Sequence, residues 1–384
     1  MIVARAGSEP GIRKIAVLRA NGIGDFLLAV PALQALHATY PAAEITLLGK
    51  PWHAPFLAGR PGPVDRVIVV PPSRGVRDEL DVVEKTAELE QFFEVMAQEG
   101  FDLAIQLHGG GRYSNPFVLR LDARMTIGLK SPEAAALDRW VPYIYFQSEI
   151  LRCLEVVSLV GATTVVLEPR LVVTAADLDE AQRLVPNAEK PLALLHPGAT
   201  DPRRRWPVEK LAAVGDALAL AGAHVVVSGT EPERALVEAV VNRMGVEAQN
   251  VCGRLSLGGL AGLLSRCRVV VSNDSGPLHL AAAVGAATVG IYWCGNLINA
   301  GPFFRARHRP AISWRLACPV CGLDCTCHEC DHRASFVADV PTEEVVASAL
   351  DLFHEPWRAR SSSLDQLNGN SRSSYGSNRL QAFE

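Results

Sequence analysis

The segment Ser272-Asn-Asp-Ser-Gly-Pro-Leu-His279 joins a short apolar run at 268–272 to a helical pattern that begins near Gly276. A strand followed at once by a helix is the unit from which a wound parallel sheet is built. Asp274, Ser275 and Gly276 place small polar groups and backbone N–H donors at the start of that helix, where anions bind. The segment therefore predicts an α/β fold with an anion site at the end of a strand.

The same alternation of strand and helix extends along the chain in both directions. In the second half we expect strands at 192–195, 223–228, 249–252, 268–272 and 286–292, and helices at 207–220, 231–243, 256–265 and 276–284. In the first half we expect strands at 14–19, 44–48, 66–70 and 101–107, and helices at 26–39, 78–98 and 147–160. Two wound sheets that face each other create a cleft, and ligands bind at the carboxyl ends of their strands.

Four units follow from this pattern. We expect an N-terminal Rossmann-like domain at 1–185, a C-terminal Rossmann-like domain at 186–340 and a C-terminal helix at 341–358. The remaining segment, 359–384, is rich in Ser, Asn, Gly and Arg, a composition that predicts disorder.

Composition limits the classes of partner. The 384 residues are 49% apolar and 20% charged, with a formal net charge of −4, which indicates an ordinary globular protein with no global attraction to nucleic acid. We find neither a signal-peptide core at the N-terminus nor an apolar run near 18 residues, so we expect a cytoplasmic protein. Peripheral contact with the inner membrane stays open.

A glycine-rich turn, Asn21-Gly-Ile-Gly-Asp25, lies between the first strand and the first helix. Glycines there let the backbone approach a ligand closely, and the helix N-terminus adds positive potential. Asp25 has two interpretations, as the cap of the helix or as a catalytic carboxylate.

Two further segments carry candidate binding groups. His196-Pro-Gly-Ala-Thr200 precedes Asp201-Pro-Arg-Arg-Arg-Trp-Pro207, whose three arginines suit a diphosphate, with a solvated basic loop as the alternative. Glu231 ends Ser228-Gly-Thr-Glu, where a carboxylate either accepts hydrogen bonds from ribose hydroxyls or favours the helix N-terminus. His279, one turn into its helix, could donate to a phosphate oxygen, with a purely structural role as the alternative.

These segments resemble glycosyltransferase family 9, whose best-known members are the ADP-heptose:lipopolysaccharide heptosyltransferases. The resemblance spans residue 14 to about residue 355 and rests on the turn at 14–36, HPGAT to RRRWP at 196–207, SGTEPE at 228–233 and NDSGPLHLAAAVG at 273–285. It implies a GT-B fold of two facing Rossmann-like domains, an N-terminal half that binds acceptor and a C-terminal half that binds donor. It also implies inversion at the anomeric carbon without a catalytic metal.

Family roles then fall on single residues. Asp25 matches the general base that takes the proton of the acceptor hydroxyl. Gly24, His108 and Arg112 fall where the family contacts its acceptor. The positions that match donor-binding residues are Thr200, Arg204, Glu231, Asp274, Ser275, Gly276 and His279.

The resemblance implies a glycosyltransferase that moves a sugar, heptose by family default, from an ADP-heptose-like nucleotide sugar to a lipopolysaccharide-core or other glycan hydroxyl. Two alternatives belong to other classes of protein. A nucleotide-sugar epimerase shares this architecture and needs no acceptor. A non-enzymatic protein would use a metal-binding loop on the same scaffold.

That loop is a cysteine cluster, Cys318-Pro-Val-Cys-Gly-Leu-Asp-Cys-Thr-Cys-His-Glu-Cys-Asp-His332. It offers more than the four thiolate or imidazole ligands of a structural zinc site. Three interpretations stay open: structural zinc, reduced loop thiols and a redox-sensitive disulfide. If zinc binds, we expect Cys318, Cys321, Cys325 and Cys330 as ligands, with Cys327 or His332 as the alternates.

Overall fold

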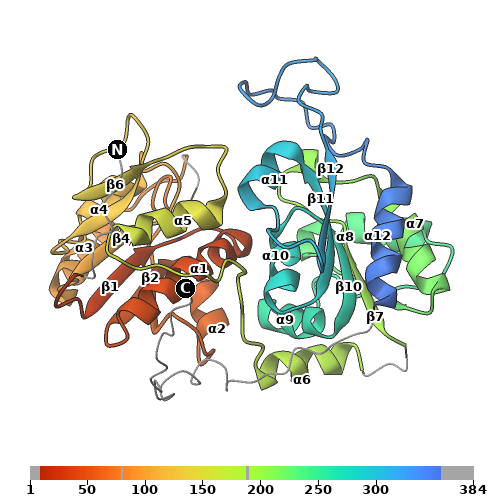
Figure 1. Cartoon of the computed structure of the whole chain (residues 1–384), viewed down its shortest axis with the longest axis horizontal. Helices are drawn as coiled ribbons and strands as arrows, with labels where there is room; N and C mark the ends of the chain where they lie inside the picture. The colour runs from red at the N-terminus through yellow and green to blue at the C-terminus, as the bar shows by residue number, and fades with distance from the viewer. Residues whose placement is uncertain (1–8, 79–80, 187–189, 356–384) are drawn as a thin grey trace, which may run out of the picture.

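The computed structural model describes residues 9–78, 81–186 and 190–355. It contains two lobes, each built on a six-stranded parallel sheet (Figure 1). The first lobe has the strand order β3-β2-β1-β4-β5-β6. Its strands are β1 (Lys14–Leu18), β2 (Glu44–Gly49), β3 (Arg66–Val69), β4 (Leu103–Gln106), β5 (Thr126–Lys130) and β6 (Arg139–Pro142).

The second lobe repeats this topology, with the order β12-β11-β10-β7-β8-β9. Its strands are β7 (Leu192–His196), β8 (His224–Val227), β9 (Gln249–Asn250), β10 (Cys267–Asn273), β11 (Ala287–Trp293) and β12 (His308–Ser313). In both sheets the order reverses beside the first strand, as in doubly wound dinucleotide-binding domains. The predicted α/β architecture of two Rossmann-like domains is confirmed.

Helices cover both sheets. They are α1 (Ile23–Thr39), α2 (His53–Leu57), α3 (Thr86–Glu99), α4 (Ser114–Leu119), α5 (Glu149–Ser158), α6 (Ala175–Leu184), α7 (Val208–Leu220), α8 (Arg234–Arg243), α9 (Leu257–Ser265), α10 (Gly276–Ala283), α11 (Cys294–Ala300) and α12 (Thr342–His354). The helix expected from residue 78 begins only at Thr86. Val83 in the preceding segment is almost fully exposed, so that segment has no core to pack against.

Helix α6 packs against α9 of the second lobe, and the glycines of α9 allow the close approach. A Cβ at Gly262 would overlap the Asp177 carbonyl, and one at Gly258 would overlap the Asp177 carboxylate. The boundary at 185/186 stays a prediction, and this packing favours a boundary before α6. The predicted C-terminal helix is present as α12, which packs on α7, whereas the tail at 359–384 lies outside the described residues.

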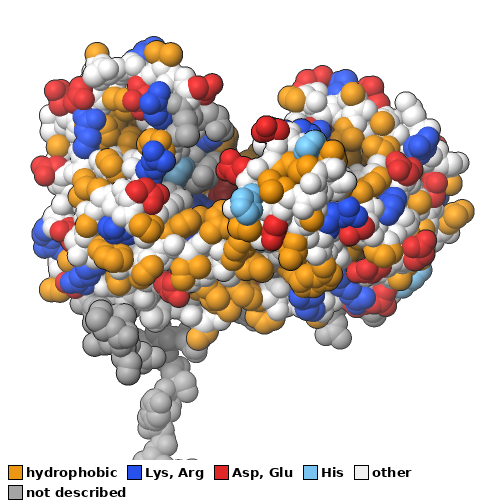
Figure 2. Space-filling view, turned by 90° about the horizontal axis from the view of Figure 1, so that it is seen from above, with side chains coloured by type: hydrophobic (Ala, Val, Ile, Leu, Met, Phe, Trp, Pro, Cys, Tyr) orange, Lys and Arg blue, Asp and Glu red, His pale blue; other side chains and the backbone are white. Residues whose placement is uncertain are grey.

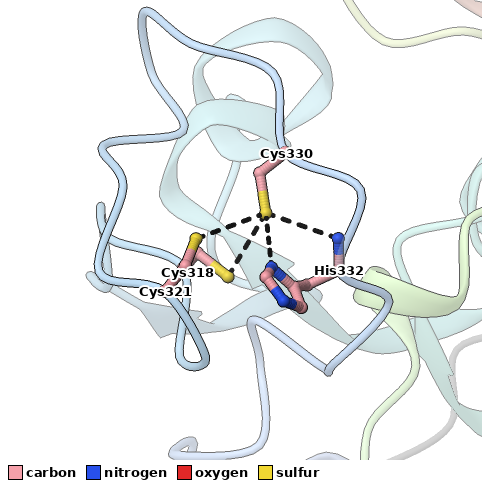
Figure 3. A group of neighbouring side chains, drawn as sticks. All are labelled: Cys318, Cys321, Cys330 and His332. Atoms are coloured by element: carbon pink, nitrogen blue, oxygen red, sulfur yellow. Dashed lines mark hydrogen bonds between the residues drawn. The ribbon is translucent and has the colours of Figure 1, made fainter.

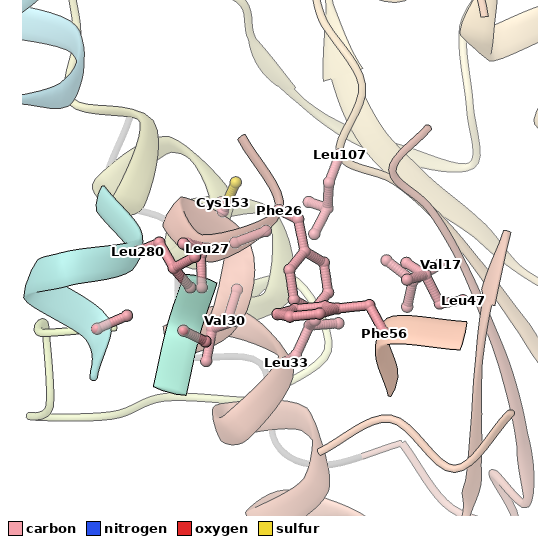
Figure 4. Packing of buried hydrophobic residues seen from close by; sticks show 14 of the residues in the cluster. Val17, Phe26, Leu27, Val30, Leu33, Leu47, Phe56, Leu107, Cys153 and Leu280 are labelled. Atoms are coloured by element: carbon pink, nitrogen blue, oxygen red, sulfur yellow. The ribbon is translucent and has the colours of Figure 1, made fainter. Parts of the chain in front are cut away.

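Helix α1 lies between the lobes and contributes to one core that runs through both. Leu27 and Val30 face Leu280 of α10, while Phe26 and other side chains pack toward the first sheet (Figure 4). The lobes are also joined by a buried ion pair, in which Arg60 Nη1 lies 2.6 Å from Asp177 Oδ2. These contacts fix the first turn of α1 relative to the second lobe.

Among the described residues, the structure contains no helix whose length and apolar character would let it cross a membrane.

Candidate active site between the lobes

The N-termini of α1 and α10 meet where the two lobes touch. A Cβ at Gly24 would lie 3.0 Å from the His279 ring and 3.6 Å from the Gly276 Cα, and a Cβ at Gly276 would overlap the side chain of Ile23. Glycine at both positions therefore permits the approach of the two helices. Both helix N-termini bring positive potential and N–H donors to one place, and the molecular surface is hollowed between the lobes (Figure 2).

Asp25 lies in the first turn of α1 with its side chain 50% exposed. Its interpretation as the helix cap is wrong, because Gly22 occupies the cap position with an extended backbone (φ −74°, ψ 173°). The helix starts at Ile23, two residues before Asp25, which leaves the carboxylate on the first turn. There it contacts Arg19, whose Nη2 lies 3.5 Å from Asp25 Oδ1.

Arg19 is a functional candidate that sequence reasoning missed. It follows β1, is almost fully buried, and its Nε donates to the Asp25 carbonyl at 3.0 Å. Its Nη1 lies 2.8 Å from Glu149 Oε1. Burial alone would lower the pKa of Arg19, but Glu149 and Asp25 raise it well above its ordinary value. The available signal was a charged residue directly after an apolar strand.

The network continues from Glu149 to Arg152, both on α5. Arg152 pairs with the second Glu149 oxygen and donates through Nη2 to the carbonyls of Ile144 at 2.6 Å and Tyr145 at 3.0 Å. A chain of alternating charges therefore links Asp25 to the loop that precedes α5. Buried charges that are paired in this way hold a fixed geometry.

On the second lobe, the carboxylate of Asp274 contacts two side chains that can donate hydrogen bonds, Arg204 and His279. Its Oδ2 lies 3.2 Å from Arg204 Nη1, and its Oδ1 lies 3.2 Å from His279 Nε2. Burial raises the pKa of Asp274, but the hydrogen bond from His279 and the charge of Arg204 bring it below its ordinary value. Its backbone N–H donates to the Ile291 carbonyl at 3.0 Å, so that N–H is not the free anion donor we expected. Because strand β10 extends to Asn273, the next residue, Asp274, still bonds with the neighbouring strand β11.

The three consecutive arginines have different partners. Arg203 binds Asp201 with Nη2 to Oδ2 at 2.6 Å, and Arg205 Nε donates to the Ala199 carbonyl at 3.0 Å. Arg204 is the one that reaches Asp274 across the cleft face of the second lobe. Thr200 is exposed in the loop after β7. Ser275 Oγ lies 3.3 Å from Ser272 Oγ at the start of α10.

Two glutamates follow β8. Glu231 is paired with Arg234 on the surface, Oε2 to Nη2 at 2.6 Å. Glu233 lies against the loop after β7, since a Cβ at Gly198 would overlap its carboxylate, and it accepts from the Thr230 N–H at 2.8 Å. The carboxylate nearest the glycine-rich loop is therefore that of Glu233, which the sequence analysis did not select.

His108 and Arg112, predicted to contact acceptor, lie in the loop after β4. His108 is buried, and its Nδ1 accepts from the Ala20 N–H at 3.2 Å, so the ring supports the turn between β1 and α1. Burial lowers the pKa of His108 to about 3, with Arg19 and Lys50 adding to the effect. Arg112 is exposed and lies over the Tyr113 ring at 5.4 Å.

This buried histidine predicts a loss of stability in acid. The unfolded chain takes up a proton at His108 below about pH 6.5, whereas the folded state resists it down to about pH 3. The unfolded state therefore binds more protons in this window, and the free energy of unfolding falls as the pH falls from 6.5 toward 3. His108→Asn keeps an acceptor for Ala20 and removes the titration. We expect its unfolding free energy to decline less than that of the wild type, by about 2–3 kcal/mol between pH 6.5 and about pH 4.5. Urea unfolding at several pH values measures these free energies. An equal decline in the two proteins over this range would contradict the prediction.

An open pocket extends from His279 along Thr288, Gly290 and Tyr292 of β11. Leu28 and Ile150 of the first lobe line it together with Tyr292 and Phe304 of the second. Both lobes therefore contribute walls to a space beside the Asp25 and Asp274 clusters.

The cysteine loop follows β12 and extends away from the lobes at the top of Figure 1. It brings Cys318, Cys321, Cys330 and His332 together, with one ligand atom of each within 4.8 Å of the others (Figure 3). Cys325, our fourth expected ligand, is not in this group. Its Sγ donates to the Leu323 carbonyl at 3.4 Å, and the alternate His332 takes its place.

Comparisons with known proteins identify the family of the chain. The model of glycosyltransferase family 9 (heptosyltransferase) matches residues 90–305, more than half of the chain. Lipooligosaccharide heptosyltransferase 2 of Haemophilus ducreyi is 23% identical over 290 residues, which cover 71% of this chain and 80% of that protein. Lipopolysaccharide heptosyltransferase 2 of Escherichia coli K12 is 24% identical over 300 residues, covering 73% and 82%.

Solved structures share the fold. A glycosyltransferase of family 9 from Veillonella parvula superposes with a TM-score of 0.72 at 21% identity, covering 90% of this chain and 98% of that one. The E. coli ADP-heptose lipopolysaccharide heptosyltransferase II gives a TM-score of 0.70 at 18% identity, covering 89% and 98%. The chain belongs to glycosyltransferase family 9 and has its GT-B fold.

Proposed function

We propose that this glycosyltransferase transfers a heptose from an ADP-heptose-like donor to a hydroxyl of a lipopolysaccharide-core acceptor, with inversion at the anomeric carbon. One observation carries the proposal. The first turn of α1, with Asp25, and the first turn of α10, with His279 held by Asp274, contact each other across the lobes. Asp25, the proposed base, and His279, part of the proposed anion site, therefore lie on opposite lobes beside the same space. The names of the relatives supply the sugar and the acceptor.

Asp25 is proposed as the general base. Its carboxylate accepts the proton of the acceptor hydroxyl as that oxygen attacks the anomeric carbon, while Arg19 and Glu149 hold its position from below. Gly24 lets the backbone approach closely. His108 acts by supporting the turn, and Arg112 is proposed to reach the acceptor from the neighbouring loop.

The donor diphosphate leaves with growing negative charge. Arg204 and His279, both pre-oriented by Asp274, and the N–H groups at Ser275 and Gly276 are proposed to stabilise it. These groups supply the charge compensation without a step that uses a metal. Thr200 is proposed to bind the diphosphate, and Glu231 or its neighbour Glu233 the nucleoside. We further propose that the enzyme works in the cytoplasm, in peripheral contact with the inner membrane where its acceptor is assembled.

A donor panel tests this function. Purified protein is mixed with several nucleotide sugars, each with and without deacylated lipopolysaccharide acceptor, and both conversion of the nucleotide sugar and release of the nucleoside diphosphate are measured. We expect ADP-heptose to be consumed only when acceptor is present. Turnover of a nucleotide sugar without acceptor would favour an epimerase, and binding of none of them would favour the non-enzymatic alternative.

A further inference from the structure

Four side chains of the cysteine loop are arranged as metal ligands. Cys330 Sγ lies 3.7 Å from Cys321 Sγ, 3.4 Å from Cys318 Sγ and 3.2 Å from His332 Nδ1. A tetrahedral zinc with Zn–S bonds near 2.3 Å separates its sulfurs by about 3.8 Å. The two sulfur–sulfur separations are close to that value, and Figure 3 shows the side chains of Cys318, Cys321 and His332 gathered around the Cys330 sulfur.

The backbone around these side chains is shaped to present thiolates. After Cys318-Pro-Val-Cys321 the chain turns at Gly322, whose φ is +72°, a conformation that glycine adopts without strain. The Val320 N–H donates to Cys318 Sγ at 3.4 Å, and the His332 N–H donates to Cys330 Sγ at 3.4 Å. Such N–H bonds favour the charged sulfur that a metal needs and orient it.

Apart from short-range hydrogen bonds such as Cys325 N–H to the Leu316 carbonyl at 3.0 Å, the loop has few stabilising contacts of its own. Val320 and Leu323 are exposed at 59% and 37%, and the one short bridge in the loop joins Ala317 to Asp324. A loop of this length without a hydrophobic core of its own is stabilised by some other cross-link, and a bound structural metal is one that small domains use. A disulfide between Cys318 and Cys330 would leave Cys321 and His332 without a reason to converge.

One end of the loop attaches to the segment that carries Arg204, and the other end attaches to the last residue of β11. Phe336 N–H donates to the Arg203 carbonyl at 2.7 Å, and Ser335 Oγ donates to the Arg205 carbonyl at 2.6 Å. At the other end, Trp293 Nε1 donates to the Arg315 carbonyl at 2.6 Å. The conformation of 314–335 is therefore linked to the backbone on both sides of Arg204.

We propose that Cys318, Cys321, Cys330 and His332 bind one structural Zn²⁺, which holds the loop 314–335 and, through Ser335 and Phe336, the backbone at 203–205. Three thiolates and one imidazole in a closed tetrahedral set are ligands of structural zinc. The family match ends at residue 305 and therefore does not include these four residues. Its effect on donor binding rests on the function proposed for Arg204, whereas the metal site does not.

Metal analysis tests the site. The full chain is purified without added metal, and its zinc and iron are measured by mass spectrometry. We expect about one zinc per chain in the wild type, about one in the matched control Cys327→Ser, whose exposed thiol lies in the same loop, and almost none in the double variant C318S/C330S. Absence of zinc from the wild type even after incubation with Zn²⁺, or iron in its place, would overturn the assignment.

Thiol counting on the wild type gives a result that does not depend on a variant folding. We expect three thiols to become reactive toward a disulfide reagent when a chelator removes the metal. A reagent count that the chelator leaves unchanged would overturn the proposal, as would a Cys318–Cys330 disulfide found by peptide mapping.

Hydrogen exchange tests the link to Arg204 without relying on activity. Removal of zinc should speed exchange at the Phe336 and Arg205 amides, and leave exchange in the first lobe unchanged. Binding of ADP, followed by calorimetry, should weaken about tenfold on removal of zinc in the wild type and change little in Arg204→Ala. Unchanged exchange at 203–205 would overturn the link. Unchanged ADP affinity despite faster exchange would instead count against the role proposed for Arg204.

Discussion

Asp25→Ala is expected to lower kcat by about 10²–10⁴-fold while binding of the nucleotide sugar persists, because a positioned general base contributes a factor of this size. The carboxylate is half exposed on the first turn of α1, where the lobes meet, and Arg19 contacts both its side chain and its backbone carbonyl. The donor groups lie on the second lobe and do not depend on it. Single-turnover transfer of labelled sugar measures the chemical step, and calorimetry with ADP measures donor binding.

Two variants separate catalysis from structure in this experiment. Asp25→Asn keeps the shape of the side chain and removes its basicity, so it should lose nearly as much turnover as Asp25→Ala. Glu209→Ala is the control, because it also removes an exposed acid from the first turn of a helix, α7, and so loses a similar interaction with the helix dipole. It should keep turnover within about twofold. Full activity in Asp25→Asn would remove Asp25 from the role of base.

The fold was predictable to the extent that its elements carry a strong apolar period. Strands β1, β2, β7, β10 and β11 are apolar runs in the centre of their sheets and were predicted within two residues at each end. The edge strands β6 and β12 were missed, because β6 alternates half-buried and exposed residues and β12 is mostly half-buried, so both give a weak signal. The inner strand β5 was also missed, because its five residues, TIGLK, make no continuous apolar run. The five-residue helix α2 is too short for a helical period to stand out.

The site divides in the same way. Single residues such as Asp25 and Arg204 could be selected from motifs that lie at strand ends. Arg19 and the holding role of Asp274 could not, because each depends on a partner brought from a distant part of the chain. In the cysteine loop, the structure groups His332, the stated alternate, with Cys318, Cys321 and Cys330 in place of Cys325. Spacing offers more than four candidate ligands and does not indicate which of them converge.

Arg204→Ala is expected to lower kcat/KM for the donor by about 10²–10³-fold, the effect of removing one preorganised donor from a developing oxyanion. Asp274 is 3% exposed and fixes Arg204 and His279 with its two oxygens before any donor arrives, so their orientation costs nothing during the reaction. Steady-state kinetics with varied donor measures the loss. Arg204→Lys keeps the charge and loses the fork of donors, so it should recover only part of the rate.

The neighbouring arginine provides the control within the same segment. Arg205→Ala removes an equal charge one residue away, where the side chain bonds only the Ala199 carbonyl among the contacts found in the described chain, and should change kcat/KM by no more than a few-fold. Equal losses in Arg204→Ala and Arg205→Ala would mean that the segment attracts the donor by its summed charge. A loss confined to Arg204 would mean that the donor is recognised by the one guanidinium that a buried carboxylate holds in place.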